Sequence, residues 1–185
     1  MPGKVLANIL NQPMILIQLA RVKRSLLVDE IVLATSNNKS DDKLAEIVEN
    51  AGYNVYRGEL EDVLKRYLDC ARKYDKPDII IRLTGDCPLT DPELVDEMIR
   101  EIKYRKIDYL SNCINEELLS VPDGFDIEIF SYDLLERAER FSTLSSEREH
   151  VTPWMRKNIE NINERHYIHE KQYPYCRLTV DDKRD

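Results

Sequence analysis

Two aspartates follow apolar segments that are typical of β-strands, and their positions suit the binding of a metal ion. Asp86 comes just after the strand expected at 78–84, and Asp181 follows the strand expected at 176–180. Hard divalent cations such as Mg²⁺ are held by one or two carboxylates together with substrate phosphates. The pair is therefore predicted to hold one Mg²⁺ against a nucleotide triphosphate. The alternatives are a helix-capping or turn carboxylate for Asp86 and a solvated charged end for Asp181.

Basic residues near the expected strand ends are candidates for binding phosphate. Pro2, Gly3 and Lys4 form a turn followed by a cation, and glycine lets backbone amides approach a phosphate to which lysine adds its charge. Arg57 and Arg82 lie near strand ends, and arginine suits bidentate contacts to a phosphate or a base. For each arginine the alternative is a surface guanidinium paired with one of the many acidic residues.

A third group of carboxylates lies at 123–128. Asp126 and Glu128 are two residues apart on a strand expected at 125–130, whose period-two alternation predicts one exposed face. They form either an acid/base pair or part of a solvated strand face. His150 is expected in the first turn of a helix that begins with a capping box at 146–149, and it either packs or lines a site. Pro153 is expected to kink or restart that helix.

The elements that must position these residues alternate between helix and strand. Short apolar strands are expected at 30–36, 54–57, 78–84 and 108–112, joined by amphipathic helices, the first of them at 14–24. This order predicts an α/β fold with a mostly parallel sheet and helices on both faces. Ligands then gather at the carboxyl ends of the strands, where Ser36, Asn37 and Arg57 also fall. One domain, 1–185, is expected, with 113–170 as a less regular lobe.

Composition excludes several classes of protein. The net charge of −8 argues against broad nucleic-acid binding, and no apolar run approaches the ~20 residues of a membrane span. Four cysteines without a CxxC spacing favour reduced thiols in a cytoplasmic protein. The motifs of common serine hydrolases, zincins and P-loop enzymes are absent from the sequence.

Seven segments in the same order resemble the spore-coat polysaccharide cytidylyltransferases, relatives of the acylneuraminate and 3-deoxy-manno-octulosonate cytidylyltransferases. They are PGKVL, DEIVLATSNN, YRGELEDVLKRY, IIRLTGDCPLTDPELVD, PDGFDIEIFS, SSEREHVTPW and RLTVDD. The resemblance implies a nucleotide-diphospho-sugar transferase (Rossmann-like) fold. It also implies transfer of CMP from CTP to a sugar acid for surface polysaccharide synthesis, with Mg²⁺ as cofactor and a homodimeric assembly.

The resemblance assigns roles to individual residues. The implied catalytic residues are Lys4, Arg82 and Asp86, and the implied metal ligands are Asp86 and Asp181. The implied nucleotide-binding residues are Pro2, Gly3, Lys4, Ser36, Asn37, Arg57, Asp62 and Arg82. The implied sugar-side residues are Asp126, Glu128 and His150.

The sequence departs from the family pattern at both ends. The family begins with a central strand and a loop that lead into the PGK triplet, whereas this sequence opens at Met1. We therefore expect a truncated chain, with a vacancy between the strands at 30–36 and 78–84. Two rivals remain open: a non-catalytic domain of the same fold, and a glycosyltransferase that consumes a nucleotide sugar.

Overall fold

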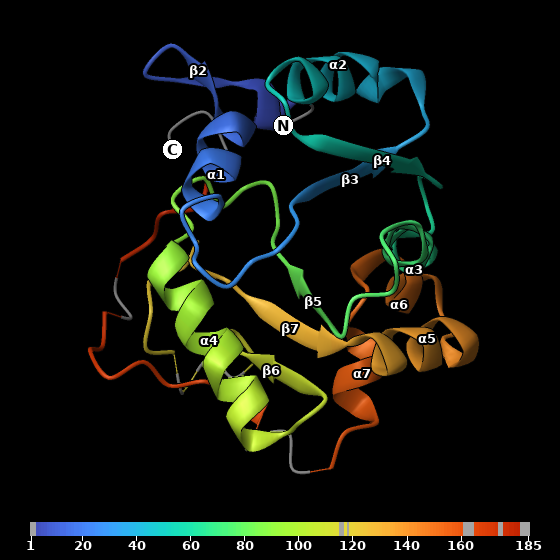
Figure 1. Ribbon diagram of the computed structural model, residues 1–185, viewed down its shortest axis with the longest axis vertical. Coiled ribbons are helices and arrows are strands. Elements are labelled where there is room, and N and C mark those ends of the chain that lie inside the picture. Colours follow the sequence, from blue (N-terminus) through green and yellow to red (C-terminus); the bar gives the residue numbers. More distant parts are fainter. Residues whose placement is uncertain (1–2, 115–116, 118, 161–164, 174–175, 182–185) are drawn as a thin grey trace. The chain divides into compact units, whose positions relative to one another are not determined.

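The computed structural model describes residues 3–114, 117, 119–160, 165–173 and 176–181 (Figure 1). The chain divides into two compact units. The first comprises residues 1–31, 81–129 and 163–185, and the second comprises 32–80 and 130–162. The single domain expected from the sequence stays a prediction. None of the helices in the described ranges has the length and apolar character needed to cross a bilayer.

The second unit is built on a pair of parallel strands. β3 (Val32–Ser36) pairs with β4 (Asn54–Gly58) in a register that places Val32 opposite Asn54 and Ser36 opposite Gly58. The connection contains the short 3₁₀ helix η2 (Lys39–Asp41) and α2 (Asp42–Asn50). Gly52, with φ +82, follows α2 and takes the left-handed conformation that ends many helices.

Four helices complete the second unit. α3 (Val63–Lys73) begins at the N-cap Asp62, and α5 (Tyr132–Phe141) begins at the N-cap Ser131. α6 (Ser145–His150) and α7 (Pro153–Lys157) follow, and α7 starts at Pro153, which confirms the expected restart. α3 packs against both α5 and α6.

The first unit contains the N-terminal segment and the longest helix. The 3₁₀ helix η1 (Lys4–Leu6) leads into a hairpin of β1 (Asn8–Ile9) and β2 (Gln12–Pro13), and α1 (Met14–Val22) follows directly. Leu10 and Asn11 turn the hairpin with positive φ, a turn that the sequence analysis missed. α4 (Pro92–Arg105) packs against β6 (Tyr109–Ser111).

A three-stranded sheet has the order β5–β7–β6 and is formed by β5 (Ile79–Arg82), β7 (Glu128–Ser131) and β6. β3 pairs with β4 and β5 pairs with β7, so no ladder joins β3 to β5 among the described residues. Direct pairing would have contradicted the predicted vacancy. The absent strand itself stays a prediction.

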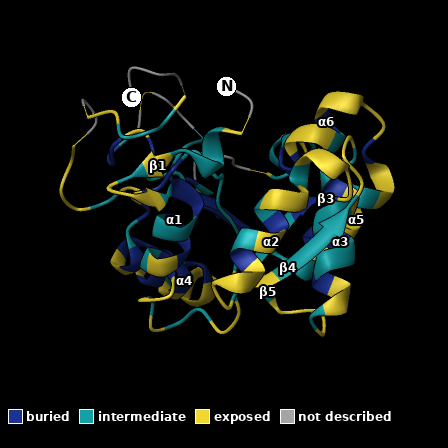
Figure 2. Cartoon of the chain, turned by 90° about the horizontal axis from the view of Figure 1, so that it is seen from above, coloured by how far each residue is buried: buried dark blue, intermediate teal, exposed yellow. Residues whose placement is uncertain are grey.

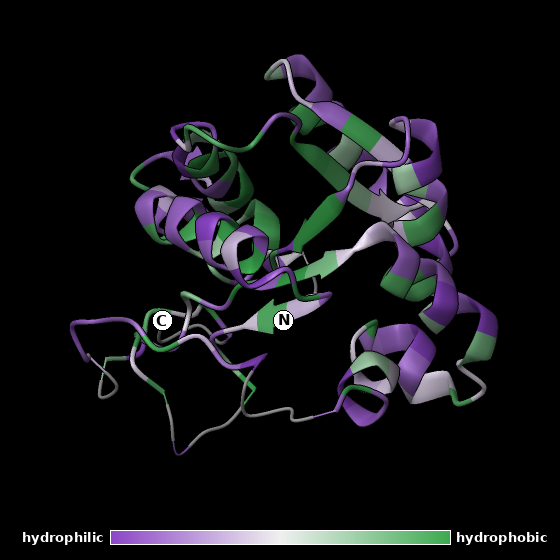
Figure 3. Ribbon diagram, turned by 60° about the horizontal axis from the view of Figure 1, so that its bottom comes forward, coloured by the Kyte–Doolittle hydropathy of each residue, from purple (hydrophilic) through white to green (hydrophobic). Residues whose placement is uncertain are grey.

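The amphipathic patterns explain the helices. α4 begins at the N-cap Asp91, whose side chain accepts a hydrogen bond from the Glu93 amide, and Pro92 suits the first turn. Figure 2 shows buried and exposed residues alternating along the helices, and Figure 3 shows the same division in hydropathy. The buried stripe of α4 comprises Leu94, Val95, Met98, Ile99 and Ile102. Together these elements confirm the α/β fold class.

The strand expected at 125–130 differs from its prediction. β7 starts only at Glu128, and Ile127, Glu128, Ile129 and Phe130 are all buried. The half-exposed face was wrong because consecutive residues, whose side chains point to opposite faces of the sheet, are all buried. The alternation of acidic and apolar residues reflects a buried ion pair, described below, rather than a solvated face.

The strand expected at 176–180 is also absent from the described residues. Arg177 forms only a single parallel bridge with Asp123, and the segment is otherwise irregular. Its backbone bonds go to a turn and a loop instead of a neighbouring strand. The residues of this segment favour a β-strand, but no neighbouring strand pairs with it among the described residues.

The start of α6 was predicted two residues too late. The N-cap is Leu144, whose amide donates to the Glu147 carboxylate, so the expected box at 146–149 lies inside the helix. His150 is consequently the last residue of α6, and its expected place in the first turn is wrong.

Candidate functional site

Asp86 lies in the loop that leaves β5, and two neighbouring elements hold this loop. Gln18 of α1 is buried and donates to the Thr84 carbonyl oxygen at 2.8 Å, and Arg21 donates to the Thr90 carbonyl at 3.0 Å. Gly85 allows η1 to approach, because an added Cβ would lie 3.0 Å from Cγ1 of Val5. The sequence analysis singled out neither Gln18 nor Arg21, which resemble ordinary helix residues.

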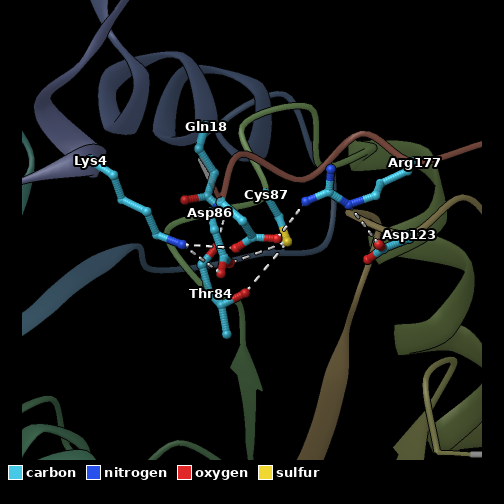
Figure 4. A network of polar contacts seen from close by, with 8 residues as sticks. Lys4, Gln18, Thr84, Asp86, Cys87, Asp123 and Arg177 are labelled. Atoms are coloured by element: carbon cyan, nitrogen blue, oxygen red, sulfur yellow. Dashed lines mark hydrogen bonds and ion pairs between the residues drawn. The ribbon is translucent and has the colours of Figure 1, made fainter. Parts of the chain in front are cut away.

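Lys4 joins the two aspartates predicted to bind metal. Its Nζ lies 3.2 Å from Oδ2 of Asp86 and 3.1 Å from Oδ1 of Asp181 (Figure 4). One ammonium group thus contacts two carboxylates from distant parts of the chain. The predicted proximity of Asp86 and Asp181 is met, and both carboxylates face a cation.

The electrostatics of this triad keep all three groups charged at neutral pH. Burial acts to raise the pKa of Asp86, but hydrogen bonds from Thr84 and Lys4 outweigh it and lower the pKa. Hydrogen bonds from Lys4 and Arg177 lower the pKa of Asp181. Burial acts to lower the pKa of Lys4, but its bonds to Asp181 and Asp86 raise it.

A second cation reaches Asp181. Nη2 of Arg177 lies 2.8 Å from Oδ2 of Asp181, and its Nε lies 3.6 Å from Oδ2 of Asp123. Figure 4 shows the guanidinium of Arg177 between Asp123 and Asp86. Sequence reasoning missed Arg177, because four residues of separation from Asp181 carry no signal outside a helix.

Arg82 belongs to a buried network. It donates to Oε2 of Glu128 at 2.6 Å, and Tyr109 donates to Oε1 at 2.6 Å. Glu128 is only 2% exposed, so these partners compensate the burial of its charge. Glu128 therefore lies in the interior beside Arg82, and its implied sugar-side role stays a prediction.

Asp126, the other carboxylate of the 123–128 segment implied in the site, has a strongly raised pKa. Burial raises the pKa to about 6, with further contributions from the negative charges of Asp123, Asp86 and Glu128. Its raised pKa thus reflects burial first and the neighbouring negative charges second. No group of three or more metal-ligating side chains was found in the described part of the chain.

The second unit brings together three residues of the implied nucleotide set. Nε of Arg57 donates to the Ser36 carbonyl oxygen at 2.9 Å, and the Asn37 amide donates to the Gly58 carbonyl at 2.7 Å. Asp41 accepts bonds from the Thr35 hydroxyl and from the amide and hydroxyl of Ser36. The carboxyl ends of β3 and β4 are thus tied into one ordered loop region.

The remaining implied residues occupy separate places. Asp62 caps α3 by accepting from the Lys65 amide, and its Oδ2 lies 2.6 Å from Nη2 of Arg148. His150 is exposed at the end of α6. Gly3 precedes η1 with φ +70, whereas Pro2 lies outside the described residues. The implied roles of these residues stay predictions.

The two carboxylates beside Lys4, those of Asp86 and Asp181, fit a hard divalent cation. Both carboxylates are ionised, they converge on one positive charge, and carboxylate oxygen is the ligand that Mg²⁺ prefers. The arrangement is suited to organising a cation and a phosphate-bearing ligand beside a lysine.

Comparisons with known proteins identify the family. The family model for cytidylyltransferases matches residues 1–183. The spore coat polysaccharide biosynthesis protein SpsF of Bacillus subtilis is 33% identical over 192 residues, covering 100% of this chain and 77% of that protein.

Two solved structures are also similar. A cytidylyltransferase from Leptospira borgpetersenii aligns with a TM-score of 0.88 and 35% identity over 98% of this chain and 76% of that one. A CMP:2-keto-3-deoxy-manno-octonic acid synthetase complexed with CTP aligns with a TM-score of 0.65 over 85% of this chain and 80% of that one. At 19% identity, this second likeness concerns the fold.

Proposed function

Because the chain belongs to the cytidylyltransferase family, we propose that it transfers CMP from CTP to a sugar acid and releases pyrophosphate. The observation that carries the proposal is the convergence of Asp86 and Asp181 on the Nζ of Lys4. It is supported by the similarity to SpsF and by the fold shared with a synthetase that was solved with CTP. Surface polysaccharide synthesis is the corresponding pathway.

Asp86 and Asp181 would hold one Mg²⁺, which supplies Lewis-acid stabilisation of phosphate charge when bound. Their lowered pKa values keep both groups in the charged form that a cation requires. Lys4 then exchanges its carboxylate partners for the phosphates of the leaving pyrophosphate. The ammonium stays protonated because the negatively charged phosphate oxygens replace the carboxylates as its acceptors.

The transferred group is the α-phosphate of CTP, attacked in line by a hydroxyl of the sugar acid. The bond between the acceptor oxygen and the α-phosphorus forms, the bond between the α-phosphorus and the oxygen that bridges to the β-phosphate breaks, and the hydroxyl proton passes to solvent water. Such reactions depend on positioning and charge neutralisation more than on covalent catalysis by the protein. Arg82 contacts the nucleotide, and Glu128 and Tyr109 orient its guanidinium.

The remaining binding residues divide between nucleotide and sugar. Ser36, Asn37, Arg57 and Asp62 bind the nucleotide, while Asp126 and His150 contribute to the sugar side. A glycosyltransferase of this fold would bind its metal through two acids on one loop. Here the second acid near Asp86 is Asp181, from a distant segment, which favours the nucleotidyltransferase. Homodimer formation and a cytoplasmic location are further expectations.

A pyrophosphate-release assay tests the proposal. The protein is incubated with Mg²⁺, each of the four nucleoside triphosphates and a panel of eight- and nine-carbon sugar acids. We expect release with CTP and one sugar acid, and loss of release in Asp86→Asn. The exposed Asp29→Asn is a control with the same change of charge. Full activity of a folded Asp86→Asn protein would contradict the metal assignment, and release with UTP instead of CTP would contradict the choice of nucleotide.

A further inference from the structure

Asp181 lies on a segment, residues 176–181, that has no regular secondary structure. Its carboxylate must nevertheless meet Asp86 if the two share a cation. The Asp181 side chain is about half exposed, so on an irregular segment it could take many orientations. Other contacts must therefore fix the position of its carboxylate. The contacts of the segment 176–181 identify what does.

Backbone hydrogen bonds dock this segment on two places in the first unit. The Asp123 amide donates to the Cys176 carbonyl at 3.0 Å, and the Leu178 amide donates to the Asp123 carbonyl at 2.7 Å. The Val180 amide then donates to the Asp86 carbonyl at 2.9 Å. The residue before Asp181 is therefore bonded to Asp86 itself.

Gly124 makes this docking possible. Its φ is +104, and an added Cβ would lie 2.7 Å from both the Leu178 carbonyl carbon and the Thr179 nitrogen. These are backbone atoms, so they cannot rotate away as a flexible side chain could. Any larger residue must push the segment 176–181 off the turn.

Arg177 connects the turn to the carboxylate. Its guanidinium lies 3.6 Å from Oδ2 of Asp123 and 2.8 Å from Oδ2 of Asp181, which leaves Oδ1 of Asp181 facing Lys4. All three side chains are about half exposed, and exposed ion pairs add little to stability. Orientation of the carboxylate is thus the main consequence of the contact.

We propose that Arg177 and the Asp123–Gly124 turn are positioning residues, which hold the Asp181 carboxylate beside Asp86 so that both can bind one cation. The inference rests on the proposed function. Groups that orient metal ligands typically change metal affinity by about 10- to 100-fold when removed. The positive charge of Arg177 opposes metal binding, but at an exposed site this repulsion is small, so loss of orientation decides the sign.

The first test measures binding of Mn²⁺ alone, followed through the electron paramagnetic resonance signal of the free ion. We expect about 10-fold weaker binding in Arg177→Gln and in Gly124→Ala, and loss of the shared site in Asp181→Asn. Arg177→Lys should also bind more weakly, because the guanidinium contacts Asp123 through Nε and Asp181 through Nη2, and an ammonium carries its donors on one nitrogen without this fixed planar spacing. Wild-type affinity in Arg177→Lys together with weak binding in Arg177→Gln would show that charge alone matters, and would overturn the orienting role.

Two matched controls separate positioning from general damage. Gly52→Ala carries the same change at φ +82 with nothing within 4 Å of the added Cβ. Arg105→Gln removes an arginine that also has an acidic partner four residues away, Glu101. Both controls should bind Mn²⁺ like the wild type. Equal loss of affinity in the controls would overturn the inference.

The second test needs no metal. Hydrogen exchange in the presence of EDTA measures the exchange rates of the Leu178 and Val180 backbone amides. Both amides should exchange faster in Gly124→Ala and Arg177→Gln than in the controls. Unchanged exchange in both variants would overturn the inference, as would wild-type Mn²⁺ affinity in both when Asp181→Asn has lost it. If Asp181→Asn itself binds Mn²⁺ normally, the metal assignment of the proposed function fails instead.

Discussion

The Nζ of Lys4 lies 3.2 Å from Oδ2 of Asp86, and the same nitrogen contacts Asp181 at 3.1 Å. The lysine of the PGK triplet is thus paired with both carboxylates that are predicted to bind metal. A divalent cation that enters this position must displace the ammonium, which becomes available for phosphate. Under the proposed function, Lys4 and Mg²⁺ would therefore compete for the carboxylate oxygens of Asp86 and Asp181.

Replacing Lys4 with methionine separates its two effects. We expect Lys4→Met to bind Mn²⁺ several-fold more tightly, because removal of a competing charge at a partly exposed site is worth about 1 kcal/mol. Pyrophosphate release should fall by at least about 100-fold, since the charge on the leaving group is no longer neutralised. Lys43→Met, an exposed change of the same type, should alter neither quantity. Weaker Mn²⁺ binding in Lys4→Met would contradict the competition.

Asp86→Asn tests the first metal ligand. The substitution keeps the size of the side chain but removes the charge that a hard cation requires. We expect turnover to fall by about 100-fold or more while circular dichroism shows an unchanged fold. Raised Mg²⁺ should restore little activity. Substantial restoration at high Mg²⁺ would indicate that Asp86 only assists another ligand.

Asp126 predicts a pH dependence of stability. Its folded pKa of about 6 lies above the ordinary value of 3.8, so the folded protein binds the proton more tightly than the unfolded chain. The resulting stabilisation is fully present below pH 3.8 and is lost as the pH rises through 6. Above pH 6 the native state carries a penalty from the burial of the ionised carboxylate and from the negative charges beside it.

Asp126→Asn removes this penalty. We expect it to raise the free energy of unfolding at pH 8 by about 1 to 2 kcal/mol, after allowance for solvent at the partly exposed carboxylate. The gain should vanish near pH 4. Urea denaturation in EDTA at both pH values measures the difference, with Asp29→Asn as the control. An equal gain at pH 4 and pH 8 would exclude titration of Asp126 as the cause.

The buried network of Arg82, Glu128 and Tyr109 predicts a change in stability. Tyr109→Phe removes the hydrogen bond that the Tyr109 hydroxyl donates to the buried Glu128 carboxylate, which should destabilise the protein by about 1 to 3 kcal/mol. Tyr104 is 85% exposed, so Tyr104→Phe should have no measurable effect. Urea denaturation checks both variants. Equal stability of the two would mean that the hydroxyl of Tyr109 contributes nothing.

Helix and strand positions followed from local patterns. The apolar stripe of Leu94, Val95 and Met98, with Pro92 in the first turn, is a local pattern that specifies α4, because amphipathicity and the fixed φ of proline act over a few residues. The apolar run ending at Arg82 likewise identified β5, and the acids after the expected strands pointed to Asp86 and Asp181.

Long-range contacts decided what local patterns left open. The alternation at Phe125–Phe130 does not reveal that β7 is flanked by β5 and β6, so the burial of Glu128 beside Arg82 was not predictable. The end of the described chain has strand-like residues, yet it docks on a turn and a loop.

The sequence by itself determined the residue types of the site, the α/β order of its elements and the family to which the chain belongs. Only the tertiary structure decided that Lys4 joins Asp86 to Asp181 and that Arg177 holds the second of these carboxylates. The physical reason is that ion pairs and the close backbone approach at Gly124 depend on positions in space. Neither the ion pairs nor the close approach at Gly124 can be predicted from the separation of the residues along the chain.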